Sequence, residues 1–272
     1  MTVLTGINSG KIDRLIEVGF CDVKIKTEYE LRRLSGPATV ILYKSGKLLV
    51  QGKETEVERV VFFLTGKTAA KKVVPKTEGG KIVRIGSDES LKGDTFGGIV
   101  VASAKLGPKE REALAKCGVQ DSKKIMNSKI HELAAEIKKV LGRKNYAIVE
   151  LLPEEYNKFK SVTAMLNAMH SRATNSLLPA YEIVVDQYPG CRVKGAILET
   201  KAESKYLSVA AASILARSVA LRQIDELSKK AGFKVPLGST HVRGALAELK
   251  KRGLAPEKFV KTGFRNVQKI FC

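Results

Sequence analysis

The sequence predicts an α/β protein with two domains. The chain has 272 residues, which is long for one average domain and sufficient for two. Hydrophobic residues make up 44% of it, enough to bury a sizeable core. Short apolar runs alternate with amphipathic segments in the C-terminal two thirds, a pattern typical of a sheet flanked by helices. We expect the domains at residues 1–66 and 81–272, joined by a linker at 67–80.

The first 66 residues predict a small, compact α+β unit. Residues 38–43 and 47–51 are β-rich runs around Ser45-Gly46, which indicates a hairpin. Apolar side chains recur at helical spacing before and after these runs. The expected elements are a helix from Ser9 to Gly19 with Ile12, Leu15 and Ile16 on one face, a strand around Val23 and Ile25, the two hairpin strands, and a helix over 54–64.

The segment 67–80 is rich in Lys, Thr and Gly and contains Pro75, a composition that favours a linker between domains. Its basic residues would also suit a phosphate backbone, but a solvated linker explains them as well.

From residue 81 the pattern changes to longer elements that suit a mixed sheet with helices on its faces. We expect strands at 82–87, 97–106, 146–151, 182–186 and 193–199, and helices at 108–117, 128–141, 162–178, 204–229 and 243–252.

Charge points to a polyanionic partner. The chain has 48 Lys and Arg against 28 Asp and Glu, a net charge of +20. Nucleic acid is the usual partner of such a protein, although a generally lysine-rich proteome would give the same excess. No apolar run approaches a membrane span and residues 1–10 lack a signal-peptide pattern, so we expect a cytoplasmic protein. We expect it to be a monomer. The four scattered cysteines predict neither a zinc site nor disulfides.

Acidic residues stand at the ends of the predicted strands. Asp88 and Glu89 follow strand 82–87, Asp186 ends strand 182–186, and Glu203 precedes a small-residue helix. Carboxylates placed together repel one another, and a divalent cation removes that cost. Oxygen ligands select Mg²⁺ or Mn²⁺, and two such ions can catalyse phosphodiester cleavage. Each acid taken singly is also explained as a turn or helix-cap residue.

Several motifs, in order along the chain, resemble those of the ribonuclease HIII family, the type 2 ribonucleases H with an extra N-terminal domain. Glu203 favours this family over ribonuclease HII, which typically has Asp at that place. Residues 38–52 resemble the end of the extra domain, which is similar in fold to half of the TATA-box-binding protein. The matching catalytic segments are 86–97 (GSDESLKGDTFG), 120–124 (QDSKK), 199–204 (ETKAES) and 208–217 (SVAAASILAR).

The resemblance implies an RNase H-like mixed sheet flanked by helices, preceded by a small α+β TATA-binding-protein-like domain. It implies endonucleolytic hydrolysis of the RNA strand of RNA/DNA hybrids, leaving 5′-phosphate and 3′-hydroxyl ends. Two Mg²⁺ or Mn²⁺ ions would be held by Asp88, Glu89, Asp186 and Glu203, with Asp88 bridging both ions.

Further residues are candidates for binding the hybrid. For most of them a structural role competes: a plain turn for Ser122 and Lys123, local packing for Asn167 and His170, and a core position for Tyr43. The candidates are Lys92, Gly93, Ser122, Lys123, Asn167, His170 and Arg217 in the catalytic domain, and Tyr43, Lys44 and Lys47 on the N-terminal hairpin.

The chain departs from the family pattern at three places: Leu91 replaces a usual glycine, Gly98 a usual proline, and Gly263 a usual histidine. In related enzymes the loop at Leu91 lies against the RNA 2′-hydroxyl, and leucine resists both close approach and positive φ. An alternative function is therefore a catalytically weak or inactive protein that binds RNA/DNA hybrids or DNA. The retained acids argue against that alternative, and the Asp-Glu context disfavours a DNA-cutting nuclease.

Overall fold

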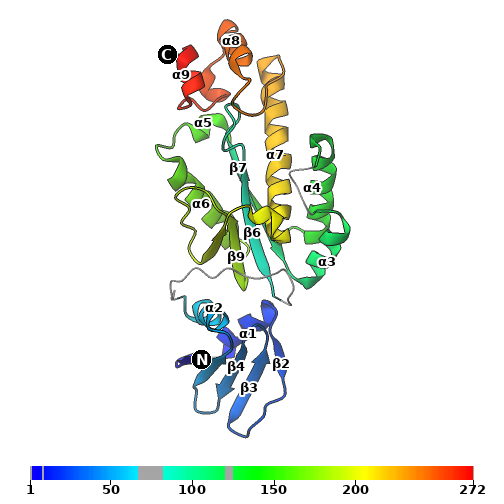
Figure 1. Ribbon diagram of the computed structural model, residues 1–272, viewed down its shortest axis with the longest axis vertical. Coiled ribbons are helices and arrows are strands. Elements are labelled where there is room, and N and C mark those ends of the chain that lie inside the picture. Colours follow the sequence, from blue (N-terminus) through cyan, green and yellow to red (C-terminus); the bar gives the residue numbers. More distant parts are fainter. Residues whose placement is uncertain (1, 8, 67–81, 120–124, 272) are drawn as a thin grey trace.

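A computed structural model of the protein describes residues 2–7, 9–66, 82–119 and 125–271. Figure 1 shows a small N-terminal domain at one end of an elongated molecule and a larger domain built around a second sheet. The predicted linker 67–80 and two substrate candidates, Ser122 and Lys123, lie outside the described residues.

The N-terminal domain is an antiparallel five-stranded sheet in the order β1-β5-β4-β3-β2, with two helices packed on one face. The predicted hairpin and both predicted helices are confirmed. Strands β1 and β3 were not predicted, and Ile16 is exposed while Val18 is buried in its place. The elements are β1 (Thr2–Leu4), α1 (Ser9–Glu17), β2 (Cys21–Val23), β3 (Glu30–Ser35), β4 (Thr39–Tyr43), β5 (Leu48–Gln51) and α2 (Glu54–Thr65).

The larger domain has a mixed sheet in the order β10-β9-β6-β7-β8. Strands β6, β9 and β10 run parallel, whereas β7 is antiparallel to both β6 and β8. The strands are β6 (Arg84–Ser90), β7 (Ile99–Leu106), β8 (Tyr146–Leu151), β9 (Glu182–Asp186) and β10 (Ala196–Glu199). The predicted mixed sheet is thus confirmed, but β6 extends further than expected, so Asp88 and Glu89 lie within the strand and not after it.

Helices cover both faces of this sheet (Figure 1). Helices α3, α4 and α7 pack on one face and α6 on the other, each over its own apolar cluster. The short helices α5 and α9 were not predicted. The helices are α3 (Pro108–Lys116), α4 (Asn127–Leu141), α5 (Pro153–Tyr156), α6 (Val162–Asn175), α7 (Leu207–Ala231), α8 (Arg243–Lys251) and α9 (Arg265–Phe271), with 3-10 turns at Ala202–Ser204 and Pro256–Lys258.

Helix α7 is the central helix of the domain. Its 25 residues are long and apolar enough to cross a membrane by length and composition alone, but 72% of the apolar window is buried inside the protein. Its apolar character is therefore explained by packing against the sheet and α4.

Gly86 brings α7 very close to β6. A Cβ at this position would lie 2.2 Å from the carbonyl carbon of Ser208 and 2.3 Å from the nitrogen of Val209, both backbone atoms of α7. No side chain fits at such distances, so the start of α7 packs directly on the strand that carries Asp88.

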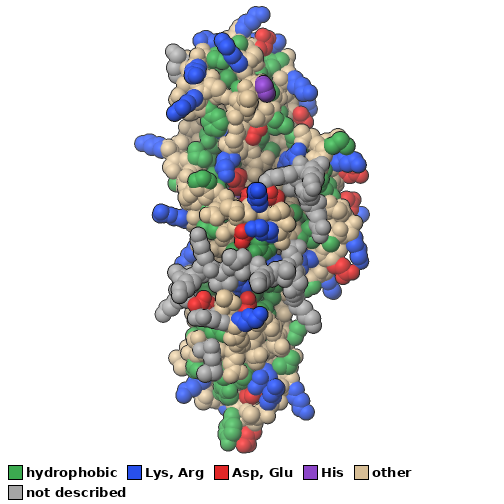
Figure 2. Space-filling view, in the orientation of Figure 1, with side chains coloured by type: hydrophobic (Ala, Val, Ile, Leu, Met, Phe, Trp, Pro, Cys, Tyr) green, Lys and Arg blue, Asp and Glu red, His purple; other side chains and the backbone are tan. Residues whose placement is uncertain are grey.

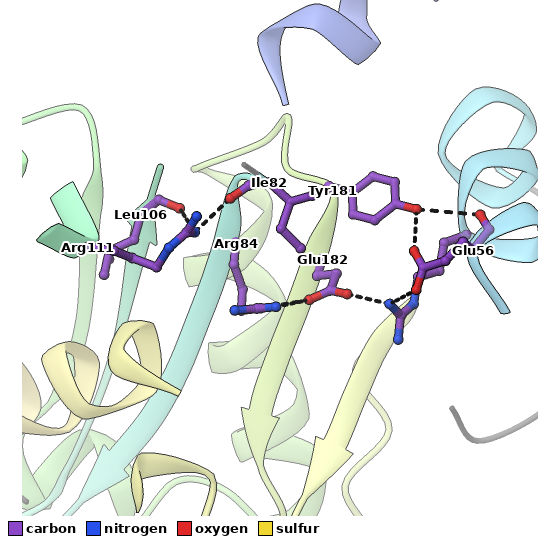
Figure 3. Close-up of polar contacts among 8 residues, drawn as sticks. Glu56, Ile82, Arg84, Leu106, Arg111, Tyr181 and Glu182 are labelled. Carbon is purple, nitrogen blue, oxygen red and sulfur yellow. Dashed lines mark hydrogen bonds and ion pairs between the residues drawn. The ribbon is translucent and has the colours of Figure 1, made fainter. Parts of the chain in front are cut away.

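A buried charge network joins the two domains (Figure 3). Its residue Arg84 begins β6, whereas Asp88 lies near the other end of that strand. The Glu182 carboxylate accepts from Arg84 of β6 at 2.6 Å and from Arg59 of α2 at 2.5 Å. Arg59 also contacts Glu56, whose carboxylate accepts from the Tyr181 hydroxyl at 2.8 Å. The Glu182 side chain is only 2% exposed, so its two arginines are needed to compensate its lost hydration.

We predict that Gly86→Ala destabilises the protein by about 3 kcal/mol, because the new methyl group meets backbone that cannot yield. Thermal unfolding measures this effect. Gly93→Ala is the matched control: nothing lies within 4 Å of a Cβ there, so its midpoint should stay close to that of the unmodified protein. Equal midpoints for the two variants would contradict the close contact.

Candidate active site

Asp88 is one of the buried acids among those predicted for the site. It lies in β6 and is 7% exposed. Its carboxylate accepts from the Glu89 backbone N–H at 2.8 Å and from the side chain of Ser213 on α7. Burial, followed by the neighbouring charges of Glu89 and Asp186, raises the pKa of Asp88 to about 7.

Asp186 lies beside Asp88 because their strands are parallel neighbours. Ser87 pairs with Val185 in the ladder, so the next residue of each strand reaches the same edge of the sheet. The Asp186 carboxylate also accepts from the Ala202 backbone N–H at 2.8 Å. That bond places the 3-10 turn Ala202–Ser204, and with it the buried Glu203, next to the strand ends.

The Glu89 carboxylate lies between two basic side chains, Lys92 and His170. The Lys92 ammonium lies 2.5 Å from one carboxylate oxygen, and the His170 Nε2 lies 3.3 Å from the other. Burial by itself raises the pKa of Glu89, but the neighbouring His170 and the hydrogen bond and charge of Lys92 outweigh it and leave the pKa lowered. The ring of His170 is fixed from behind, since its Nδ1 lies 2.8 Å from the Ser87 hydroxyl.

These four acids are suited to divalent cations by their chemistry. A buried carboxylate such as Asp88, held among like charges, is stabilised by a cation, and hard oxygen donors select Mg²⁺ or Mn²⁺. Within the described part of the chain, however, no three acidic, histidine or cysteine side chains converge as a ready-made metal cage. Glu89 is turned to Lys92 and His170 instead. The assignment of all four as metal ligands stays a prediction.

The loop after Glu89 is a tight turn over residues 91–94. Leu91 has φ of 70°, the left-handed conformation that a glycine takes without cost, and its side chain is 4% exposed within the apolar core. From the sequence we expected leucine to resist positive φ and close approach of the backbone to the substrate. The side chain instead points into the protein, and around Gly93 space is open.

Gly98, the second departure from the family pattern, has a definite partner. Its backbone N–H donates to the Gln223 side chain of α7 at 2.6 Å, a bond that proline cannot make. A Cβ on Gly98 would also lie 2.1 Å from the Leu151 carbonyl oxygen. The glycine therefore allows β8 and α7 to approach the start of β7 closely.

The remaining predicted substrate residues of this domain have structural partners. Asn167 accepts from the Tyr188 hydroxyl at 2.9 Å and from the Arg192 backbone at 2.7 Å. His170 is fully buried, so it supports Glu89 and offers no surface to a ligand. Arg217 donates to Asn127 at 2.6 Å. Lys92 keeps 39% of its side chain exposed and remains the substrate candidate nearest the acids.

The three candidates for hybrid binding in the N-terminal domain lie on or beside the sheet face that the helices do not cover. Strand alternation places Tyr43 on the sheet face opposite to the helices, with Ile41 and Leu49. Lys44 and Lys47 are exposed at the adjoining hairpin. Figure 2 shows that lysine and arginine side chains are spread over both domains and are not confined to one patch.

Comparison with known proteins decides the family. A family model described as Ribonuclease HII matches residues 85–267. A ribonuclease HIII of Streptococcus agalactiae is 33% identical, over 87% of this chain and 86% of that protein. The chain belongs to the ribonuclease HIII family. It is therefore an enzyme, a ribonuclease H nuclease, as the motifs predicted.

Solved structures of ribonuclease HIII share the fold over nearly the whole chain. The structure of Bst-RNase HIII in complex with Mn²⁺ has a TM-score of 0.64 and 27% identity, covering 98% of this chain and 97% of that one. The Aquifex aeolicus RNase H3 structure has a TM-score of 0.63 and 28% identity, covering 97% and 100%. These matches include the N-terminal domain, so its predicted TATA-binding-protein-like character fits the ribonuclease HIII fold.

Two supporting side chains of the site were missed from the sequence. Ser213, which donates to Asp88, was only one small residue among many in α7. Ser87 was part of the first motif, but its contact with His170 joins residues 83 positions apart. Neither contact leaves a pattern in the local sequence. The serines among the alanines at the start of α7, Ser208 and Ser213, are the one feature that could have indicated a polar contact from this helix.

We predict that Asp88→Asn stabilises the metal-free protein at alkaline pH. The folded-state pKa of about 7 lies above the unfolded value of 3.8, so Asp88 contributes stability below pH 3.8 that is lost as pH rises through 7. In chelator at pH 8 the variant should gain on the order of 3 kcal/mol, and the gain should vanish near pH 4. Thermal unfolding across this range measures it, with the exposed Asp225→Asn as control. A gain that does not depend on pH would contradict the assignment.

Proposed function

We propose that this ribonuclease H cleaves the RNA strand of RNA/DNA hybrids endonucleolytically by two-metal-ion catalysis, leaving 5′-phosphate and 3′-hydroxyl ends. The observation that carries the proposal is Asp88, a buried carboxylate whose pKa is raised to about 7 beside Glu89 and Asp186. A cation between such groups removes their repulsion. The Mn²⁺ complex of Bst-RNase HIII supports the same choice of ion.

Asp88, Glu89, Asp186 and Glu203 would hold the ions, with Asp88 beside both Glu89 and Asp186. When bound, two Mg²⁺ or Mn²⁺ ions activate water and stabilise the leaving 3′ oxygen of an in-line displacement. The chain itself presets the acids: Ser213 orients Asp88, Ala202 orients Asp186, and His170 holds Glu89.

Substrate contacts in the catalytic domain centre on the turn after Glu89. Lys92 extends from this turn over the Tyr188 ring at 5.3 Å and keeps its ammonium partly in solvent. A cation at that place attracts the phosphate backbone toward the acids. Around Gly93 space is open, so a sugar or phosphate can approach the backbone closely.

The N-terminal domain would bind the hybrid through its open sheet face. Its helix α2 contacts the catalytic domain through the ion pair of Arg59 with Glu182, and Tyr43 and the Lys44–Lys47 hairpin belong to the opposite face of the sheet. A sheet that presents aromatic and basic side chains can dock a duplex. The domain would then contribute affinity and leave the chemistry to the second domain.

The alternative, a catalytically weak or inactive binder, rested on Leu91. The leucine occupies the same positive-φ conformation that glycine adopts, and its side chain is directed into the core. The loop therefore keeps its backbone open toward the acids. This favours an active enzyme over a lapsed one.

We expect Asp88→Asn and Asp186→Asn each to abolish hydrolysis of a labelled RNA/DNA hybrid while changing hybrid affinity little. Loss of a ligand charge prevents metal binding but leaves the basic contacts in place. Cleavage assays with Mg²⁺ or Mn²⁺, and binding assays in chelator, measure the two effects. Asp225→Asn, an exposed acid on α7, serves as the control and should cleave normally. Full activity in Asp88→Asn would overturn the proposed site, and end-labelling of the products tests the end chemistry.

Replacement of Lys44 and Lys47 together by Gln should raise KM and leave kcat nearly unchanged, since binding that is equal in the ground and transition states appears in KM alone. The dependence of log affinity on log salt should become shallower by about 2, one unit for each lost phosphate contact. The control removes Lys11 and Lys53 from the helical side of the same domain. Equal salt slopes for both pairs would show that the hairpin does not bind the hybrid.

A further inference from the structure

Leu91 takes a backbone conformation that its own chemistry opposes. With Lys201 it is one of two residues other than glycine that have positive φ in the described part of the chain. For an L-residue this conformation brings Cβ too close to the following carbonyl oxygen, so other contacts must hold it in place. The turn itself supplies only one long hydrogen bond, from the Asp94 N–H to the Leu91 carbonyl at 3.2 Å.

A fully buried lysine supplies the stronger contacts. The Lys261 ammonium donates to the Leu91 carbonyl and to the Asp94 carbonyl, each at 2.5 Å. These two carbonyls belong to the first and last residues of the turn. The Lys261 Nζ thus closes the turn across its base. Burial lowers the pKa of Lys261 to about 7, and the group keeps N–H donors for both carbonyls in its charged and its neutral form.

The surroundings of Lys261 keep its ammonium at this place. The side chain is 0% exposed, and its ammonium lies 5.2 Å from the centre of the Tyr156 ring and 5.4 Å from that of Phe264. The backbone N–H of Lys261 donates to the Thr95 carbonyl at 3.0 Å, which ties the segment to the end of the loop. Phe96 and Val260 form a β-bridge beside it.

We propose that Lys261 is a positioning residue for the active-site turn 91–94, and that it holds Leu91 in the left-handed conformation. The proposal rests on the proposed function, because the turn matters only if Glu89 and Lys92 serve the metal-dependent cleavage. Lys261 does not reach solvent or the acids, so it acts through the turn.

The conformation of the turn determines where the Lys92 ammonium and the backbone at Gly93 lie in the site. Lys92 and Gly93 are its central residues, and Lys92 bonds to Glu89. If Leu91 relaxes to negative φ, the turn re-aims both the Lys92 ammonium and the open backbone at Gly93. A shift of about 1 Å in such groups can lower a rate 100-fold.

A role in core packing alone is the competing explanation. A buried ammonium is costly, and an apolar residue of similar volume would fill the same space without that cost. Lys261→Met keeps the long apolar stem beside Tyr156 and Phe264 and removes only the three N–H donors. This substitution therefore separates packing from positioning.

We expect Lys261→Met to lower kcat about 100-fold while the affinity for hybrid in chelator changes within about twofold. The control is Lys258→Met, the loss of an exposed lysine three residues away, which should retain kcat. Near-ultraviolet circular dichroism and thermal unfolding establish that each variant is folded at the assay temperature. A wild-type kcat in folded Lys261→Met would overturn the proposal.

The decisive test is rescue by glycine. In Lys261→Met, adding Leu91→Gly should restore kcat about tenfold, because glycine adopts positive φ without a clamp. Adding Leu91→Ala should restore nothing, since alanine also truncates the leucine but retains the Cβ that opposes positive φ. A role in packing predicts no rescue by either, because each removes buried apolar surface.

Failure of rescue by glycine, or equal rescue by alanine, would overturn the proposal. The proposed function fails separately, through full activity of Asp88→Asn. The two conclusions are therefore distinguishable in one set of assays.

Discussion

The close contact between β6 and α7 determines most of the site. Gly86 lets the backbone of α7 lie against the strand, so that Ser213 of the helix reaches Asp88 of the strand. The same contact places the 3-10 turn with Glu203 just before the helix, beside the strand ends. A side chain at position 86 would separate the two elements, and the acids would no longer share one site.

Burial and electrostatic repulsion are balanced by specific partners throughout the protein. At the site, Glu89 is stabilised by Lys92 and His170, whereas burial and the charges of Glu89 and Asp186 raise the pKa of Asp88. At the other end of the same strands, Glu182 is stabilised by two arginines from different domains. Strands β6 and β9 thus connect the Glu182 carboxylate, which two arginines compensate at the domain junction, to the Asp88 carboxylate, whose nearest charges are those of Glu89 and Asp186.

The departures from the family pattern are accommodated by nearby residues. Gly98 supplies an N–H to Gln223, and Leu91 turns its side chain into the core while Lys261 binds its carbonyl. These two departures therefore come with partners that suit them, whereas nothing lies within 4 Å of a Cβ at the third, Gly263. The contact of Lys261 with the Leu91 carbonyl explains how the loop keeps free space around Gly93 although residue 91 is not glycine.

The sequence by itself determined the α/β fold class and most helices and strands, because periodicity and motifs are local, and it singled out four acids whose role as metal ligands stays a prediction. Strand β3 was missed because its charged residues hide the alternation, and His170 was assigned to substrate although it supports Glu89. The contacts of Lys261 with Leu91 and of Arg59 with Glu182 join residues 170 and 123 positions apart. Only the tertiary structure decided these contacts, because packing brings together partners whose pairing leaves no trace in local spacing.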